Sequence, residues 1–291
     1  MKEIISVEVK TQKADFVKVK TDLLAVGVFS DVKGLDKLNK ELDGKLGGAI
    51  ERLIKLEDFK GRDGTGAVVY GNGKIGAKRI LLVGLGEKKK AKLDTVRKAA
   101  AYAANKAVDM KAENLGLALH RPFEGQFDSV AIGRVITEGV YFGSYRYDEY
   151  VTTGENGRRG KLKAELVEPD KAKLKKLNEG LSKGIIIGQA QSLARTLSNR
   201  PGNVINPPQL AAIAKKAVKG IARLSCNVFD EKQLKAKKMG GILAVGSGSK
   251  TPPRLIVLKY SPAGSAVEVA TARPSVTFDR SAQMRSNWSC V

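Results

Sequence analysis

The sequence is poor in the residues that most often carry catalytic and metal chemistry. Its 291 residues include one histidine, two cysteines and one tryptophan, and aromatic residues make up only 5%. Cys226 and Cys290 stand far apart and outside any CxxC or Cys/His cluster, so neither a disulfide framework nor a zinc knuckle is expected. Any metal site in such a chain would have to be built from carboxylates.

The single histidine, His120, stands in LALHRPFEG at the end of an expected strand. A Ser-His-Asp or Cys-His triad would have to use this residue, yet no G-x-S-x-G nucleophile signature accompanies it. The sequence therefore gives no support for catalysis by His120. For Cys226, in RLSCNVFD, we expect a small buried strand residue.

Long apolar runs are missing as well. No stretch approaches 18 consecutive apolar residues, the length that suggests a membrane-spanning helix. The first ten residues, MKEIISVEVK, alternate charged with β-branched residues where a secretory signal would have an apolar run. We therefore expect a cytoplasmic protein with no membrane partner. The hydrophobic fraction of 42% suffices for two domains with ordinary buried cores.

Acidic residues are outnumbered by basic ones, 30 against 52, which gives a formal net charge of +22. A field of that sign attracts polyanions, so nucleic acid is a candidate partner. Most of the charge is lysine in runs at 88–98, 170–183 and 231–241, which are not interleaved with aromatic residues that could stack on bases. Solvated helix faces are the simpler interpretation, because charge runs commonly decorate helices. DNA binding through a basic surface stays open as an alternative function.

Two periodicities alternate along the first 150 residues, the period of two typical of strands and the 3.6-residue period typical of helices. Strands separated by helices predict an α/β layer sandwich with a mixed sheet. The helix-containing segments are 34–59, with an interruption near Gly47 and Gly48, 92–108 and 127–145. The expected strands are 3–10, 23–31, 66–70, 77–86 and 114–120.

A polar, lysine-rich stretch at 151–168 marks the expected domain boundary, and we interpret it as too polar for a core. Beyond it, one helix is expected to end near Pro201, because proline cannot continue the hydrogen-bond ladder, and the next to open with proline in its first turn. These helices span 183–201 and 207–222, and strands follow at 224–230, 240–248, 253–260 and 266–272. We expect this second α/β unit to be incomplete.

Three glycine-rich segments resemble phosphate-binding loops, and none of them carries a strong signal. GNGKIG (71–76) is followed by a strand instead of a helix, so a hairpin loop is predicted. GLGEKKK (84–90) does lie between an expected strand and an expected helix, so an anion could bind there, but one glycine pair is weak evidence and a tight strand-to-helix turn is the favoured interpretation. GSGSKT (246–251) lacks glycine directly before the lysine and a helix directly after it, as a Walker loop needs. We therefore expect no cofactor-binding loop.

Five segments taken in order carry a family resemblance. They are LEDFKGRDGTG (56–66), AKRILLVGLGEK (77–88), TEGVYFGSYRYDEY (137–150), ARTLSNRPGNVINPPQLA (194–211) and MGGILAVGSGSKTPPRLIVLKYSPAG (239–264). Together, over roughly residues 20–264, the chain resembles the leucyl aminopeptidases of the cytosol aminopeptidase type.

The resemblance implies a fold and an activity. It implies an N-terminal macrodomain-like α/β domain at 1–155, a basic linker with a linking helix at 156–182, and a catalytic α/β domain that is incomplete at 183–291. The family removes N-terminal amino acids from peptides with a water bound between two divalent ions, zinc or manganese, which stabilise the attacking oxygen and the developing oxyanion. Subunits of the family usually form hexamers, so a homo-hexamer is implied here too.

The family's metal-site motif is only partly matched. It reads approximately V-G-K-G-V-T-F-D-[ST]-G-G-x-[SN]-[IL]-K-P, in which the first lysine and the aspartate bind metal and the second lysine polarises the scissile carbonyl. Residues 272–286 read ARPSVTFDRSAQMRS, so Asp279 falls on the metal-binding aspartate. The remaining motif positions are replaced by Pro274 and Ser286 at the two lysines and by Arg280, Ser281 and Ala282 after the aspartate.

The expectation from this partial match is a family member that is truncated and catalytically incompetent. The next aspartate ligand and the N-T-D-A-E-G-R segment, which supplies further carboxylates and an arginine in the family, are not found in the chain. Asp279 is then the one family ligand retained, and it is expected to be unoccupied, because one carboxylate cannot hold two divalent ions against water. No catalytic or cofactor-binding residue is assigned.

Overall fold

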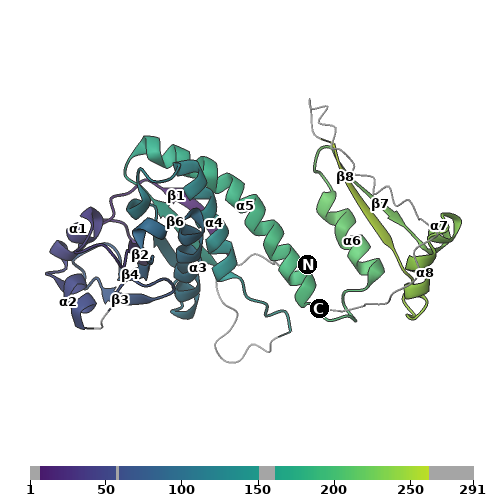
Figure 1. The fold of residues 1–291 in the computed structure, drawn as a ribbon, viewed down its shortest axis with the longest axis horizontal. Coiled ribbons are helices and arrows are strands. Elements are labelled where there is room, and N and C mark those ends of the chain that lie inside the picture. Colours follow the sequence, from purple (N-terminus) through teal and green to yellow (C-terminus); the bar gives the residue numbers. More distant parts are fainter. Residues whose placement is uncertain (1–6, 57–58, 151–160, 262–291) are drawn as a thin grey trace, which may run out of the picture. The chain divides into compact units, whose positions relative to one another are not determined.

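The computed structural model describes residues 7–56, 59–150 and 161–261 (Figure 1). By internal contacts the chain divides into two compact units, Met1–Arg200 and Pro201–Val291. No helix in these three described ranges is long and apolar enough to cross a membrane.

The first unit is built on a six-stranded sheet. Its strands lie in the order β1-β6-β5-β2-β4-β3. Only β3 runs antiparallel to its neighbour β4, and the other paired strands are parallel, so the predicted mixed sheet is confirmed. The strands are β1 (Val7–Gln12), β2 (Leu23–Val28), β3 (Gly66–Tyr70), β4 (Arg79–Gly84), β5 (Asn114–Leu117) and β6 (Leu162–Val167).

Helices cover both faces of this sheet, which makes three layers (Figure 1). Leu81 and Val83 of β4 pack into the core under α3, α4 and α5, whereas Ile80 and Leu82 pack into the core under α1 and α2. This alternation follows from the two-residue period of a strand. The helices are α1 (Lys37–Lys45), α2 (Ala49–Leu56), α3 (Leu93–Asp109), α4 (Ser129–Ser144) and α5 (Lys171–Asn199), with short 3-10 turns η1 (Lys88–Lys90) and η2 (Arg121–Phe123).

The interruption predicted inside 34–59 is confirmed. Gly47 and Gly48 have φ angles of 66° and 80°, a region that favours glycine, and they separate α1 from α2. The carboxylate of Asp43 accepts hydrogen bonds from the backbone N–H groups of Ile50 and Glu51 at 2.7 and 3.2 Å. The two short helices are thereby fixed to each other.

The interpretation of 151–168 as too polar for a core is wrong for its last residues. β6 lies inside the sheet between β1 and β5, with Leu162, Ala164 and Leu166 buried. Their alternation with Lys163 and Glu165 gives the strand buried positions despite its charge. The segment expected as a linker, 156–182, thus contains β6 and the first turns of α5, while the domain boundaries themselves stay a prediction.

α5 is longer than the expected helix at 183–201, and it begins at the N-cap Asp170. Its first turns are rich in exposed lysine, which hid the helix in the sequence. Glycines let this helix approach α4 closely: a Cβ atom at Gly180 would overlap the carbonyl oxygen of Val130, and one at Gly133 would overlap that of Leu177. The register between the two helices is therefore set by backbone contact.

The second unit contains a two-stranded antiparallel sheet of β7 and β8. The strand expected at 240–248 is wrong, because α8 occupies this position; a short apolar run such as GGILAVG fits either element. Cys226 lies on β7 as predicted, but it is only partly buried. The expected strand at 266–272 lies outside the described residues. The elements are α6 (Pro207–Val218), β7 (Leu224–Phe229), α7 (Glu231–Ala236), α8 (Gly240–Gly246) and β8 (Leu255–Tyr260).

Candidate functional site

The residue predicted to bind metal, Asp279, lies outside the described residues, as do the neighbouring motif positions from Pro274 to Ser286. Within the described ranges no group of three or more His, Cys, Asp or Glu side chains could hold a metal ion. The described residues therefore do not fit a two-metal centre. No catalytic step through a metal is derived from them.

His120 forms a buried pair with Glu168. It stands just before η2, and its Nε2 lies 2.8 Å from Oε2 of Glu168, which directly follows β6. The other carboxylate oxygen, Oε1, accepts a hydrogen bond of 2.9 Å from the backbone N–H of Asp170. The pair thus joins the end of β5 to the N-terminus of α5.

Charge and hydrogen bonding keep Glu168 ionised. Burial raises the pKa of this carboxyl, but the hydrogen bond from His120, the backbone N–H of Asp170 and the nearby Arg121 outweigh burial and hold the pKa below its usual value. Arg121 Nη1 lies 3.5 Å from Glu168 Oε2, and its guanidinium carbon lies 5.5 Å from the Phe16 ring centroid. Because both of its carboxylate oxygens accept hydrogen bonds, Glu168 stabilises the contact between the segment that follows β5 and the start of α5.

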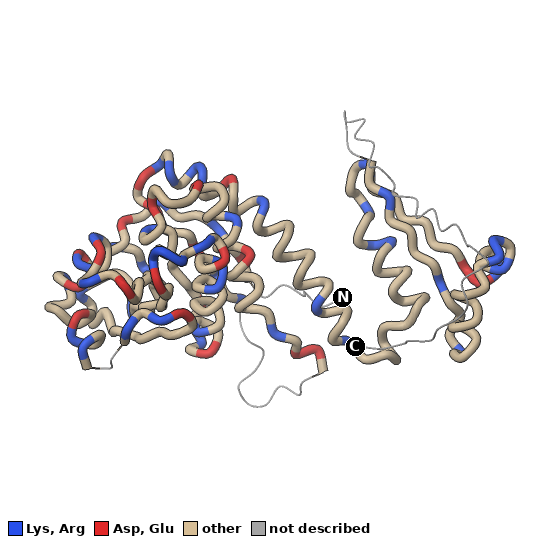
Figure 2. Tube along the Cα trace, viewed as in Figure 1, with Lys and Arg blue, Asp and Glu red and all other residues tan. Residues whose placement is uncertain are grey.

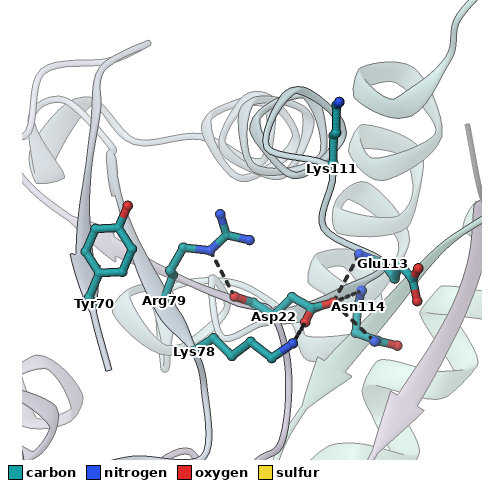
Figure 3. Close-up of a pocket in the computed structure, with 7 residues that line it drawn as sticks. All are labelled: Asp22, Tyr70, Lys78, Arg79, Lys111, Glu113 and Asn114. Atoms are coloured by element: carbon teal, nitrogen blue, oxygen red, sulfur yellow. Dashed lines mark hydrogen bonds and ion pairs between the residues drawn. The ribbon is translucent and has the colours of Figure 1, made fainter. Parts of the chain in front are cut away.

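A pocket of about 580 Å³ opens at the amino ends of three parallel strands, β2, β4 and β5 (Figure 3). At its centre Asp22 accepts a hydrogen bond from Lys78 Nζ at 2.7 Å on Oδ1. On Oδ2 it accepts the backbone N–H groups of Glu113 and Asn114 at 3.1 and 3.0 Å. Sequence reasoning missed this cluster, because its members come from segments 56 and 91–92 residues apart.

The environment of Asp22 decides what this pocket can do. The hydrogen bond from Lys78 and the backbone N–H groups of Asn114 and Glu113, opposed by burial, lower the pKa of Asp22 from 3.8 to about 2. A carboxylate so saturated is a poor base and has little capacity left for a metal ion. Arg79 and Lys111 also line the pocket, and Figure 3 shows the Lys111 ammonium directed away from the Asp22 carboxylate. Asp22 accordingly has a structural role: its carboxylate joins the start of β2 to Lys78 before β4 and to Glu113 and Asn114 at the start of β5, an arrangement called here the strand latch.

The glycine-rich segments lie where their contexts predicted. GNGKIG forms the turn of the antiparallel β3–β4 hairpin, with Asn72 and Gly73 at φ angles of 48° and 72° and Lys74 N–H donating to the Gly71 carbonyl at 2.9 Å. GLGEKKK connects β4 to α3 through η1, as predicted. GSGSKT comes after α8 and leads into β8, so a strand follows it.

The lysine runs lie on helix surfaces. Figure 2 shows basic residues spread along the chain, interspersed with acidic ones over the first unit. In α5 the lysines at 171, 173, 175 and 176 are exposed, whereas Leu177 and Leu181 on the same helix are buried. The prediction of solvated helix faces is confirmed for this run.

Comparison with known proteins identifies the family to which this chain belongs. The family model described as "Cytosol aminopeptidase family, N-terminal domain" matches residues 25–153, and the one described as "Cytosol aminopeptidase family, catalytic domain" matches residues 192–281. The two matches together cover well over half of the chain. The chain belongs to the cytosol aminopeptidase family, so the predicted family is confirmed.

Individual relatives support the same family assignment. A protein of Aquifex aeolicus (strain VF5) named "Probable cytosol aminopeptidase" is 37% identical over 281 residues, which cover 96% of this chain and 53% of the relative. A protein of the same name from Sulfurihydrogenibium sp. (strain YO3AOP1) is 34% identical over 275 residues, or 94% of this chain and 53% of the relative. The chain thus spans about half the length of the curated relatives it matches.

Solved structures support the fold. A mutant of tomato leucine aminopeptidase matches with a TM-score of 0.78 at 23% identity, over 91% of this chain and 53% of its own. The bottromycin maturation enzyme BotP in complex with Mn matches with a TM-score of 0.64 at 26% identity, over 84% of this chain and 46% of its own. The predicted mixed α/β fold class is confirmed, and nothing in these comparisons supports the nucleic-acid alternative.

Proposed function

We propose that this chain has the scaffold of a metal-dependent leucyl aminopeptidase but does not itself remove N-terminal amino acids from peptides. The observation that carries the proposal is the replacement of both motif lysines, by Pro274 and Ser286, in a chain that otherwise belongs to the family. Proline offers no amine to a metal ion, and a serine hydroxyl has no positive charge with which to polarise a carbonyl.

The remaining motif residue cannot replace what is lost. Asp279 keeps one carboxylate, but a carboxylate cannot supply the amine of the metal-binding lysine or the positive charge of the second motif lysine. Manganese or zinc stays the expected metal of a complete family site, and a structural relative, BotP, is in complex with Mn. For this chain we propose that neither ion is held at the level a catalyst needs.

The test combines an activity readout with a binding readout. The purified full chain is assayed with leucine p-nitroanilide in the presence of Mn²⁺ or Zn²⁺, and metal binding is titrated calorimetrically on the same sample. We expect no turnover above the metal and buffer control, and no difference between the wild type and Asp279→Ala in either measurement. Turnover that Asp279→Ala abolishes would overturn the proposal, and so would tight binding of two ions per chain.

Assembly and location are part of the same proposal. The family implies a cytoplasmic homo-hexamer acting on peptides with a free N-terminus, and sedimentation velocity on the full chain measures its assembly directly.

DNA binding stays an untested alternative. Its signature is affinity for duplex DNA that falls steeply with salt, as counterion release requires. Absence of binding even at low salt would remove this alternative.

A further inference from the structure

A second pocket of the first unit lies apart from the Asp22 cluster and from the family motif. It has a volume of about 470 Å³ and is lined by residues of α3, by the end of α4, by Arg195 of α5 and by the end of β4. Three aromatic side chains line it, Tyr102, Phe142 and Tyr145. Its volume is in the range of sites for small molecules.

Arg195 is the central cation of this pocket. Its guanidinium carbon lies 4.0 Å from the centroid of the Tyr145 ring and 4.7 Å from that of Phe142. One of its nitrogens, Nη1, donates a hydrogen bond of 3.1 Å to the carbonyl oxygen of Phe142. These contacts hold the guanidinium over two rings and anchor one of its nitrogens to the backbone.

Most of the hydrogen-bonding capacity of Arg195 is unused. A guanidinium has five N–H donors, and among the described residues the contacts of Arg195 are one hydrogen bond, to the Phe142 carbonyl, and the two aromatic rings, with no carboxylate partner. A fixed, planar group with free donors matches the geometry of a carboxylate or phosphate. The unused donors therefore point to an anion.

The surrounding charges favour the same class of ligand. Lys98 and Arg146 also line the pocket, where Asp63 is the one acidic residue. Arg146 is held in place by the carbonyl oxygens of Gly143 and Tyr145, to both of which its Nη1 donates at 2.9 Å. Lys98 lies 3.4 Å from Asp94 and its side chain is 62% exposed, so its ammonium is free to reorient. Arg146 Nη2 also lies 3.4 Å from Asp109 Oδ1, so Lys98 and Arg146 each have a carboxylate neighbour, and Arg195 is the basic lining residue without one among the described residues.

The aromatic side chains of the pocket favour a ligand with a planar group. Phe142 is 50% exposed at the pocket, and Tyr102 is partly buried in its wall. The floor is rigid, because Gly143 lies so close to α3 that a Cβ atom there would overlap the carbonyl oxygen of Ala101. Rings and guanidinium planes held on a rigid floor can stack on a planar group.

We propose that this pocket binds a small anion that carries a planar aromatic group. The phosphate or carboxylate accepts hydrogen bonds from Arg195 and Arg146, and the ring packs against Phe142 and Tyr102. This site requires no metal and no residue of the aminopeptidase motif, so it stands independently of the proposed function. Both a nucleoside monophosphate and an aromatic carboxylate have the required chemistry, and binding experiments distinguish them.

The experiment titrates the full chain with three probes, adenosine monophosphate, indole-3-acetate and inorganic phosphate, by isothermal calorimetry at low salt. We expect at least one aromatic anion to bind about tenfold more tightly than inorganic phosphate, because stacking adds to the ionic contact. Preference for the nucleotide assigns a phosphate ligand, and preference for indole-3-acetate assigns a carboxylate ligand. Failure of both aromatic probes at millimolar concentration overturns the proposal, and so does equal binding of all three.

Two variants and a matched control locate the binding. Arg195→Gln is expected to weaken the preferred probe about tenfold or more, since it removes charged hydrogen bonds. Lys183→Gln removes a positive charge from an exposed site of the same helix and is expected to change binding less than about twofold. Phe142→Ala, at a half-exposed site that tolerates truncation, is expected to weaken the aromatic probe and not inorganic phosphate. Unchanged binding in Arg195→Gln or in Phe142→Ala contradicts the assignment.

Discussion

Asp22→Asn tests the strand latch at the amino ends of β2, β4 and β5. The substitution keeps the shape of the side chain, removes its charge and replaces one acceptor oxygen by an amide donor. That oxygen faces either Lys78 Nζ or the backbone N–H groups of Glu113 and Asn114. At least one partner of the carboxylate therefore loses its acceptor.

The lowered pKa gives the size of the effect. Because the folded protein lowers the pKa of Asp22 from 3.8 to about 2, the ionised carboxylate stabilises the fold by roughly 2 kcal/mol. This stabilisation is fully present above pH 3.8 and is lost as the pH falls through about 2. Asp22→Asn is thus expected to cost about 2 kcal/mol at pH 7 and roughly half of that at pH 3.

The assay is urea unfolding of the full chain, followed by far-ultraviolet circular dichroism at pH 7, 5 and 3. Lys78→Met is the matched control: the Lys78 side chain is 76% exposed and its charge is screened by water, so we expect a loss below about 1 kcal/mol that shrinks further in salt. Any loss in Asp22→Asn beyond that in Lys78→Met is then assigned to the backbone N–H groups of Glu113 and Asn114. An unchanged unfolding midpoint in Asp22→Asn at pH 7, or a loss that does not depend on pH, would refute this reasoning.

The other two substitutions test helix packing and the buried pair. Gly180→Ala places a methyl group against the Val130 carbonyl and is expected to lower the free energy of unfolding by about 1–3 kcal/mol, measured by urea unfolding. Gly44→Ala, in α1 with open space around it, is the control and is expected to stabilise by about 0.5–1 kcal/mol. Glu168→Ala leaves His120 and Arg121 without their buried carboxylate and is expected to cost about 3 kcal/mol, measured as a lower Tm. Because the pKa of Glu168 is below the usual 4.5, the stability lost in Glu168→Ala should be largest at pH 7 and should shrink on acidification below 4.5.

Each of these expectations has a clear counter-result. Equal stability of Gly180→Ala and Gly44→Ala would show that α4 and α5 separate at little cost. A Tm for Glu168→Ala within a degree of the wild type would mean that water reaches the His120 pair and replaces the carboxylate. Either outcome would contradict the packing described for the first unit.

Local chemistry made part of the fold predictable. The break at Gly47 and Gly48 and the hairpin at 71–76 depend on residues within the turn itself, so the sequence alone identified them. β6 and α8 depend on their surroundings instead. Leu162, Ala164 and Leu166 are buried because β1 and β5 flank them, and the neighbouring charges concealed their alternation.

The sites divide in the same way. The family motif identified Asp279 from a contiguous stretch of sequence, and that residue stays a prediction, outside the described residues. The Asp22 latch has no such stretch, since its partners come from the starts of three strands that only the folded sheet brings together. The pocket around Arg195 is likewise formed by residues of α3, α4 and α5, which no short sequence motif contains together.

The place of β6 in the sheet has a consequence for biosynthesis. Among the described strands β1 pairs with β6 alone, and the partners Val7 and Leu162 are 155 positions apart in the chain. A ribosome adding about 5–20 residues per second needs roughly 8–30 s to make that interval. During this time β2, β3, β4 and β5 are synthesised. β6, the neighbour of β1 in the sheet, is not yet available for pairing. Within the six-stranded sheet, the first of the described strands to be synthesised is therefore the last to gain its partner, because β1 cannot pair until β6, which ends at Val167, has been made.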